Sequence, residues 1–559
     1  MERCIPSMHP SRNLAKSING MALISSSLEG TSRSVTSSSA SSFPGLQAQA
    51  VRNAYDLNSM SVPQKFRAIG DFHEYYNGAR LAPYLTLFVG GNHEASSHLQ
   101  ELYYGGWAAP NIYYLGAANV LRLGDLRIAG LSGIWKGYNY NKSHFERVPY
   151  TADEIKSLYH LREIDVRKLL LLRSQVDVGL SHDWPRGVEW QGDYKALFRK
   201  KDLFEADARA GTLGSSAARY LMDRLRPPYW FSAHLHCKFA AVVDYSGKKP
   251  ISESMPNGAE KTEVHEAKNT DETDMGFVEE AEAHLFDSSG PIKNDAEIDL
   301  ELEDESPIPA PAATTSNPKP TPKVHTTPTA LPRVSSDIRS QLPASFSRPL
   351  PSQVRTSQPS PPPPKIINIT TNFLALDKCL PNRQFLQFLT IDPLSPSEPP
   401  APLKLTYDPE WLSILRVFAP HDPHLPSPQN IGEPSYKPLI ETERAWVEEN
   451  VVQKQKLQIP ENFELTAPVY DGRDIRSVGR AQPKEWSNPQ TNAFCELVGI
   501  PNHFDSCEEE RARRRVKKES EIAAEDANGS RGRGGSSGRR GGGRGGRDGG
   551  RGRGRGRGR

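Results

Sequence analysis

Several features that would assign this chain to a common class are missing from its sequence. No run of about 18 consecutive apolar residues occurs, so no transmembrane helix is expected. The net charge is only +2, so the average charge favours no class of partner. The five cysteines are scattered and form no CxxC pair: Cys4, Cys237, Cys379, Cys495 and Cys507. This pattern argues against a disulfide scaffold or a structural zinc module and suits a reducing compartment.

Core-forming residues are also scarce. Hydrophobic residues make up 36% of the 559 residues, beside 47 Pro and 43 Gly, so a large part of the chain is expected to be disordered. Changes in composition predict five segments: a Ser-rich, mostly disordered stretch (1–42), a globular domain (43–245), an acidic and then Pro/Ser/Thr-rich disordered linker (246–365), a second, mainly helical unit (366–500), and a disordered basic cluster with an Arg-Gly tail (501–559).

Apolar patterning in the globular domain predicts an α/β fold. Helices are expected at residues 49–76, 152–173 and 208–225. Short apolar runs predict strands at 84–89, 112–115, 126–132, 176–180, 229–232 and 238–244. Strands that alternate with helices imply a sheet covered by helices, with ligand-binding groups gathered at one edge.

The most informative stretch is residues 84–94, YLTLFVGGNHE. An apolar run followed by two glycines is typical of a buried strand that ends in a sharp turn. Gly90 and Gly91 permit the turn and leave room for a ligand. The turn would present Asn92 and His93, whose amide oxygen and imidazole suit a transition metal acting on phosphate. Alternatively, both side chains only cap the following helix.

Two later strands also end in histidines. The run at 176–180 is followed by SHDWP, which contains His182, and the run at 229–232 is followed by AHLH, with His234 and His236. Each histidine alone could be a polar residue satisfied within its own turn. Three strand ends of this kind in succession predict a metal site, and their ligands suit a two-metal hydrolase acting on a phosphodiester.

The motifs also resemble a known family. GNHE, SHDWP and SAHLHCKF together resemble the calcineurin-like metallophosphoesterases. The longer stretches GGNHEASSHLQELYYGGWAAPNIYYLG, RIAGLSGI, LSHDWPRG and YWFSAHLHCKFAA resemble the RNA lariat debranching enzymes, and FLALDKCLPNRQFLQ and YDPEWL resemble their C-terminal domain. The resemblance covers residues 48–245 and 366–450. It implies a metallophosphoesterase-type β-sandwich flanked by helices, and hydrolysis of the 2′–5′ phosphodiester at the branch point of intron lariats during mRNA processing.

The same resemblance implies roles for individual residues. Asn92, His182 and His234 would bind the second of two divalent metal ions (Fe, Zn or Mn), and His236 would bind the first. His93 would be the general acid that protonates the leaving 2′ oxygen. An imidazole suits this role because its pKa lies near neutral pH.

Residues 134–159 correspond to the family's lariat-recognition loop. Aromatic and basic residues alternate there, a pattern suited to unstacked RNA bases and to phosphates. The candidate RNA-binding residues are Trp135, Tyr138, Tyr140, His144, Phe145 and Arg147. Considered without the family, the same stretch could be a loop at the edge of the core.

The N-terminus departs from the family pattern. The family begins with a strand that ends in Cys-x-His or Asp-x-His, and with a second strand that ends in Gly-Asp, whose Asp bridges both metals. Its GDFQAVRN corresponds here to residues 46–53, LQAQAVRN, so the bridging position falls on Gln47. Cys4 lacks the spacing to His9, and Asp71 of the Gly-Asp-Phe-His stretch follows the QAVRN segment. A neutral amide cannot replace the carboxylate that holds two cations together.

Three functions therefore stay open. The motifs favour a lariat debranching enzyme that binds branched intron RNA. A protein phosphatase of the same superfamily would carry a Gly-Asp-x-x-Asp-Arg-Gly stretch, which does not occur in this sequence. The third possibility is a catalytically impaired RNA-binding isoform, or a mis-assembled chain in which residues 1–46 replace the first two strands.

The C-terminal end adds two predictions. The basic cluster RARRRVKK at 511–518 is of the nuclear-import kind and predicts location in the nucleus, although it could also be just a solvated face. The Arg-Gly tail at 528–559 cannot fold, but its guanidinium groups suit phosphates and bases. It therefore predicts non-specific RNA binding, with solubility as the alternative role, and no membrane partner is expected.

Overall fold

A computed structural model describes residues 22–25, 50–246, 362–379 and 382–531. These described residues all belong to one compact unit. Most of the predicted linker and the Arg-Gly tail beyond residue 531 lie outside the described residues. Within the described ranges, no helix is long and apolar enough to cross a membrane.

Two β-sheets form the framework of this unit. The four-stranded sheet has the order β1-β2-β4-β3, and the seven-stranded sheet has the order β11-β5-β6-β7-β8-β10-β9. In the larger sheet, the neighbours β6, β7, β8 and β10 are parallel, and the remaining pairs are antiparallel. The strands are β1 (Ala22–Ser25), β2 (Thr86–Val89), β3 (Gly106–Ala109), β4 (Ile112–Tyr114), β5 (Ala118–Leu123), β6 (Leu126–Leu131), β7 (Val178–Ser181), β8 (Tyr229–Ser232), β9 (Phe239–Asp244), β10 (Thr370–Ala375) and β11 (Leu405–Tyr407).

Twelve α-helices of 4 to 24 residues accompany the strands in the described part of the chain. They are α1 (Phe72–Tyr76), α2 (Ser96–Glu101), α3 (Gly137–Tyr140), α4 (Ala152–Ser157), α5 (Glu163–Leu170), α6 (Tyr194–Lys200), α7 (Leu203–Ala210), α8 (Ser216–Leu225), α10 (Pro409–Phe418), α11 (Glu433–Val447), α12 (Pro489–Val498) and α13 (Glu508–Arg531). Single 3-10 turns lie at Asp56–Ser59, Gln64–Phe66, Val188–Gln191 and Ile475–Val478, and a π-helical turn at Glu448–Val452 follows α11.

Strand β2 is buried on both faces. Leu87 and Val89 pack into the large core that includes residues of the seven-stranded sheet. Phe88 packs on the opposite side with Tyr114, in a cluster that also contains residues of α1 and α2. Burial on both faces explains the unbroken apolar run in the sequence. It also fixes the position of the turn that follows β2.

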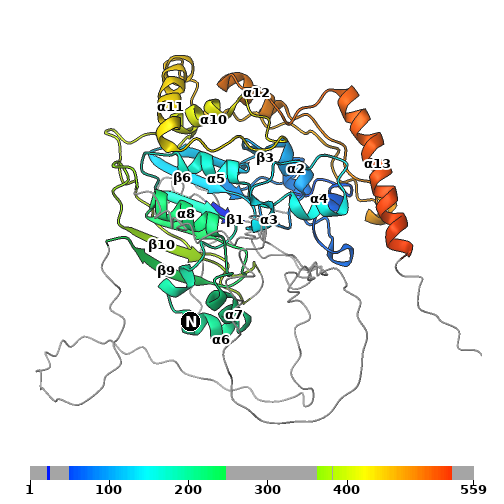
Figure 1. Cartoon of the computed structure of the whole chain (residues 1–559), viewed down its shortest axis with the longest axis horizontal. Helices are drawn as coiled ribbons and strands as arrows, with labels where there is room; N and C mark the ends of the chain where they lie inside the picture. Colours follow the sequence, from blue (N-terminus) through cyan, green and yellow to red (C-terminus); the bar gives the residue numbers. More distant parts are fainter. Residues whose placement is uncertain (1–21, 26–49, 247–361, 380–381, 532–559) are drawn as a thin grey trace, which may run out of the picture. The chain divides into compact units, whose positions relative to one another are not determined.

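The segment after the linker completes the seven-stranded sheet. Strand β10 lies between β8 and β9, and Figure 1 shows it beside β9. Strand β11 pairs with β5 at the opposite edge of the sheet. The buried carboxylate of Asp408, which caps α10, accepts hydrogen bonds from the Arg127 guanidinium at 2.7 and 2.9 Å. Helices are the main regular elements of residues 366–500, beside strands β10 and β11, but this segment shares a sheet and a core with the globular domain rather than standing apart from it.

The predicted mixed α/β class is confirmed, and all six strands expected between residues 43 and 245 are present. Their ends differ from the expected ones by two residues or fewer. Strands β3 and β5 were not predicted. The sequence of β3, GWAA, contains Gly and Ala, which are depleted in strands.

The long helices predicted from apolar spacing are wrong in extent. Residues 49–76 form two 3-10 turns and α1 instead of one helix. Residues 152–173 divide into α4 and α5, because Leu161 N–H donates to the carbonyl of Ile134 and the fully buried Arg162 pairs with Glu146. Residues 208–225 divide between α7 and α8 at Gly211 and Gly214, whose positive φ angles a helix cannot adopt.

Two stretches expected to be disordered are ordered where the structure describes them. Residues 22–25 form β1, parallel to β2. The whole basic cluster lies in α13, which lies beside α4 (Figure 1) and contacts it through an ion pair between Lys518 and Glu154. Arg511 pairs with Asp505 at 2.7 Å, and Arg514 pairs with Glu485. Part of the basic cluster is therefore engaged within the protein.

Candidate functional site

Three predicted metal ligands meet at the carboxyl ends of β2, β7 and β8. Nε2 of His182 lies 3.1 Å from Oδ1 of Asn92 and 3.1 Å from Nδ1 of His234. His182 is fully buried. The structure thus brings together an amide oxygen and two imidazole nitrogens from turns that are far apart in the sequence.

The turn after β2 is held by its own side chains. The carboxylate of Glu94 accepts hydrogen bonds from the backbone N–H groups of Gly91, at 2.7 Å, and His93, at 3.2 Å. A Cβ at Gly91 would lie 2.2 Å from Cε1 of His182. Only glycine therefore permits the close approach of this turn to the His182 ring.

The turns after β7 and β8 are bonded to each other. Ala233 N–H donates to the carbonyl of His182 at 3.0 Å, and the indole N–H of Trp184 donates back to the carbonyl of Ala233 at 2.8 Å. At the ends of β7 and β8, the hydroxyls of Ser181 and Ser232 lie 2.9 Å apart. These bonds fix the distance between the two histidine-bearing turns.

The backbone at His234 and His236 is in the left-handed region, with φ of 55° and 52°. Non-glycine residues adopt this conformation at a cost, and such residues cluster at functional sites. Nε2 of His236 is buried without a hydrogen-bond partner. Burial, followed by the charges of Lys378, His234 and His93, lowers the pKa of His236 to about 2. The ring is therefore neutral, the form that binds metals.

The donor set fits a divalent transition metal ion at Asn92, His182 and His234, since imidazole and carbonyl oxygen are both accepted ligands. Among the described residues, no group of three His, Cys, Asp or Glu side chains is placed to hold a metal ion, so the amide of Asn92 is needed to complete the set. Gln47, Cys4 and His9 lie outside the described residues.

The six candidate RNA-binding residues divide into two groups. Trp135 and Tyr140 pack on each other with ring centroids 4.7 Å apart, and the side chains of Tyr138 and Phe145 are 67% and 39% exposed. The other two are engaged internally. His144 Nε2 lies 2.6 Å from Oδ2 of Asp165, and Arg147 pairs with Glu485 at 3.0 Å. Both contacts lie within the protein, and a role of these two residues in RNA binding stays a prediction.

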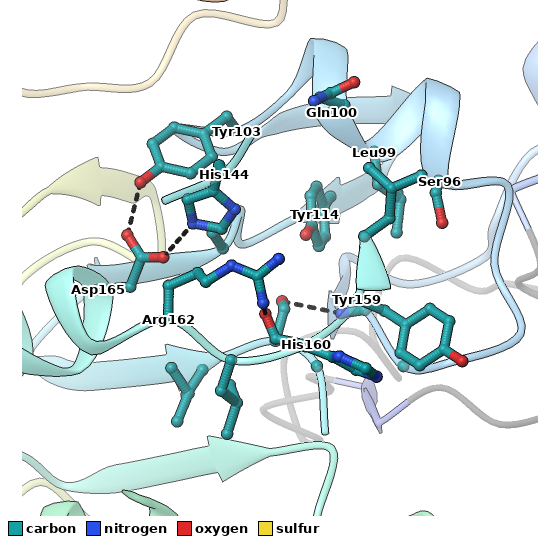
Figure 2. A pocket seen from close by; sticks show the side chains of 18 of the residues that line it. Ser96, Leu99, Gln100, Tyr103, Tyr114, His144, Tyr159, His160, Arg162 and Asp165 are labelled. Carbon is teal, nitrogen blue, oxygen red and sulfur yellow. Dashed lines mark hydrogen bonds and ion pairs between the residues drawn. The ribbon is translucent and has the colours of Figure 1, made fainter. Parts of the chain in front are cut away.

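A cavity of about 80 Å³ lies beside the turn at Gly90 and Gly91. Figure 2 shows the bonds of its wall, where the carboxylate of Asp165 accepts from the Tyr103 hydroxyl at 2.5 Å and contacts the His144 ring. The described candidate metal ligands do not line it. The space is sufficient for several water molecules. It is therefore a cavity next to the site, with both polar and apolar residues in its wall.

Two residues connect the recognition stretch to the site through contacts that sequence reasoning did not predict. The carboxylate of Asp183 accepts a hydrogen bond from the backbone N–H of Trp135 at 3.1 Å. The Arg186 guanidinium lies over the Trp135 ring, 6.0 Å from its centroid. Both belong to the SHDWPRG stretch, so its charged residues after the histidine were the available signal.

Comparison with known proteins agrees with this geometry. Residues 368–503 match the family model of the lariat debranching enzyme C-terminal domain. The chain is 40% identical over 459 residues to the lariat debranching enzyme of Schizosaccharomyces pombe, covering 81% of this chain and 89% of the relative. It is 34% identical to the Arabidopsis thaliana enzyme, over 82% of this chain and 78% of the relative. It is 36% identical to the Homo sapiens enzyme, over 81% of this chain and 62% of the relative. Similarity at this level over most of both chains shows that the chain belongs to the family of lariat debranching enzymes.

Proposed function

We propose that this chain hydrolyses the 2′–5′ phosphodiester at the branch point of intron lariat RNA, with Asn92, His182 and His234 holding a divalent metal ion. The observation that carries the proposal is the convergence of their three donor atoms: Nε2 of His182 lies 3.1 Å from Oδ1 of Asn92 and 3.1 Å from Nδ1 of His234. When bound there, the ion would polarise the phosphoryl group. His236 would be a ligand of a second ion, and Fe, Zn and Mn all accept this donor set.

His93 is proposed as the general acid. It lies in the turn held by Glu94 and is only 5% exposed. Its charge is among the causes that lower the pKa of His236, after burial and the charges of Lys378 and His234. In the protonated form, the His93 ring would donate its proton to the leaving 2′ oxygen. A fixed and nearly dry imidazole suits this step, since proton transfer needs the donor within hydrogen-bond reach.

The branch-point nucleotides would bind on the exposed aromatic side chains of this stretch. Tyr138 and Phe145 offer exposed ring surfaces for unstacked bases, and the partly buried Trp135 packs beside Tyr140. Arg186 adds a cation beside Trp135. Because Asp183 bonds the backbone of Trp135, this surface is connected to the turn that carries His182.

Two parts of the proposal concern the basic C-terminus. The Arg-Gly tail, residues 528–559, would add salt-dependent affinity for any RNA. Its deletion should weaken binding of linear RNA and leave branch cleavage in place. The cluster at 511–518 would direct the protein to the nucleus. A fluorescent fusion with this cluster neutralised should then lose nuclear accumulation.

The test is cleavage of a synthetic 2′–5′ branched RNA by the full chain, after chelation and resupply of Mn²⁺, Zn²⁺ or Fe²⁺. We expect cleavage by the wild type and a loss of about 10²–10⁴-fold in His93→Ala, the range of general acid catalysis. The matched control is His421→Ala, because His421 is a half-buried histidine in the C-terminal segment. Wild-type rates in His93→Ala would refute the assigned role. No cleavage with any ion would leave only an RNA-binding protein.

A further inference from the structure

The chain that follows the linker returns to the sheet beside the candidate metal ligands. Strand β10 runs parallel to β8, with Ala375 opposite Ser232. Parallel neighbours leave a sheet at the same edge. Strand β8 continues into the AHLH turn, and β10 continues into Asp377 and Lys378. The two turns therefore lie next to each other at the edge where ligands bind in such sheets.

Asp377 holds this neighbouring turn in place. One oxygen of its carboxylate accepts from the ammonium of Lys200, at 3.0 Å, and from the backbone N–H of Lys238, at 3.2 Å. The other oxygen accepts from the backbone N–H of Gln384 at 3.2 Å. The Asp377 side chain is only 5% exposed. The carboxylate thus joins the end of α6, the stretch just after the AHLH turn and the segment after β10.

Lys378, the next residue, lies in this turn, beside the turn that carries His234 and His236, and it is half-buried. Lys201, at the end of α6, directly follows Lys200, whose ammonium bonds the Asp377 carboxylate. These lysines bring positive charge to a site whose candidate ligands, Asn92 and three histidines, carry none when neutral.

We propose that Lys378 binds a phosphate of the branched RNA at the rim of the metal site, and that Asp377 is the residue that positions it. This inference rests on the proposed function and assigns a role in it to the C-terminal segment. An RNA branch point carries three phosphodiesters close together, and an ammonium group is a common phosphate partner. The C-terminal segment would then contribute directly to substrate binding.

The test is equilibrium binding of the full chain to branched RNA and to linear RNA of the same composition, in chelator so that no cleavage occurs. We expect Lys378→Gln to lower the affinity for branched RNA by about tenfold, as for loss of one charge-assisted hydrogen bond. The slope of log affinity against log salt should fall by roughly 0.7–0.9, the value for one lost phosphate contact. Asp377→Asn should shift both quantities in the same direction.

The matched control is Lys404→Gln. Lys404 is exposed, bonds Gln458 at 3.2 Å and precedes β11 at the other edge of the sheet. It should leave binding unchanged. The Arg-Gly tail is present in every variant, so its contribution cancels in the comparison. Thermal unfolding of both lysine variants checks that the fold is intact.

The outcomes separate this inference from the proposed function. Unchanged affinity and salt slope in Lys378→Gln would overturn the phosphate contact, whether or not the wild type cleaves. Equal losses in Lys378→Gln and Lys404→Gln would overturn it too, because the effect would then reflect overall charge. Failure of the wild type to cleave, together with a selective loss in Lys378→Gln, would refute the proposed reaction and support the contact. If the Asp377→Asn variant does not fold, the Lys378→Gln variant still tests the phosphate contact.

Discussion

Adding a single methyl group at Gly91 should disable the site. A Cβ there would lie 2.2 Å from Cε1, 2.4 Å from Nδ1 and 2.7 Å from Nε2 of His182, whereas ordinary contacts begin at 3.4 Å. The His182 ring would have to move by roughly an ångström, a misplacement that can lower an enzyme's rate about 10²-fold. The ring is fully buried, so it cannot swing into solvent.

We therefore expect Gly91→Ala to reduce kcat/KM for branched RNA by about 10²-fold. The overpacked methyl should also lower the free energy of unfolding by roughly 1–3 kcal/mol. Cleavage assays and urea unfolding measure the two effects separately. Gly211→Ala is the control, because it has open space around its Cβ and a φ of +68°. It should lower the stability by about 1 kcal/mol without touching the site.

Cleavage by Gly91→Ala at the wild-type rate would refute this prediction, since the His182 ring would then not lie against the turn. An equal loss of activity in Gly211→Ala and Gly91→Ala would refute it too. In that case, the loss would follow from stability alone.

Three further predictions concern the fold. Burial, followed by the charge of Arg52, lowers the pKa of His98 from 6.5 to about 3. On acidification, His98 is therefore protonated in the unfolded chain before it is protonated in the folded protein. The free energy of unfolding should fall by roughly 1.4 kcal/mol per pH unit between pH 6.5 and pH 3. Urea unfolding of His98→Asn should show a smaller decrease of this free energy with falling pH. Asp408→Asn leaves Arg127 buried with weaker compensation and should cost roughly 3–5 kcal/mol of unfolding free energy. Replacing residues 248–361 with a short flexible linker should preserve cleavage and shift Tm by only a few degrees, because loop-closure entropy varies slowly with length.

The candidate site could be anticipated because its chemistry is local in sequence. Each ligand follows its own apolar strand directly, so strand and ligand are read together in GNHE, SHDWP and AHLH. The contacts that hold these turns could not be foreseen. The bond from the Trp184 indole to Ala233, for example, joins residues 49 positions apart.

The helices were harder to foresee because tertiary contacts override apolar spacing. The break after α4 depends on Arg162 reaching Glu146, which no periodicity reveals. Strand β10 did have a local signal, since Thr371, Phe373 and Ala375 alternate and are all buried. Its position between β8 and β9 is a long-range pairing that sequence order alone does not give.

Strands β9 and β10 are antiparallel neighbours, with Asp244 opposite Thr370, and Tyr245 N–H donates to the carbonyl of Ile369 at 2.8 Å. In topological terms they form one β-hairpin, and the residues between them occupy the place of its turn. Such a turn can gain or lose length without altering the connections of the fold. The halves on either side are not interchangeable modules. A fragment that ended before β10 would lose the strand between β8 and β9 and expose an unpaired edge of β8, a site for aggregation. The segment that ends with β9 and the segment that begins with β10 therefore have to be expressed and engineered together.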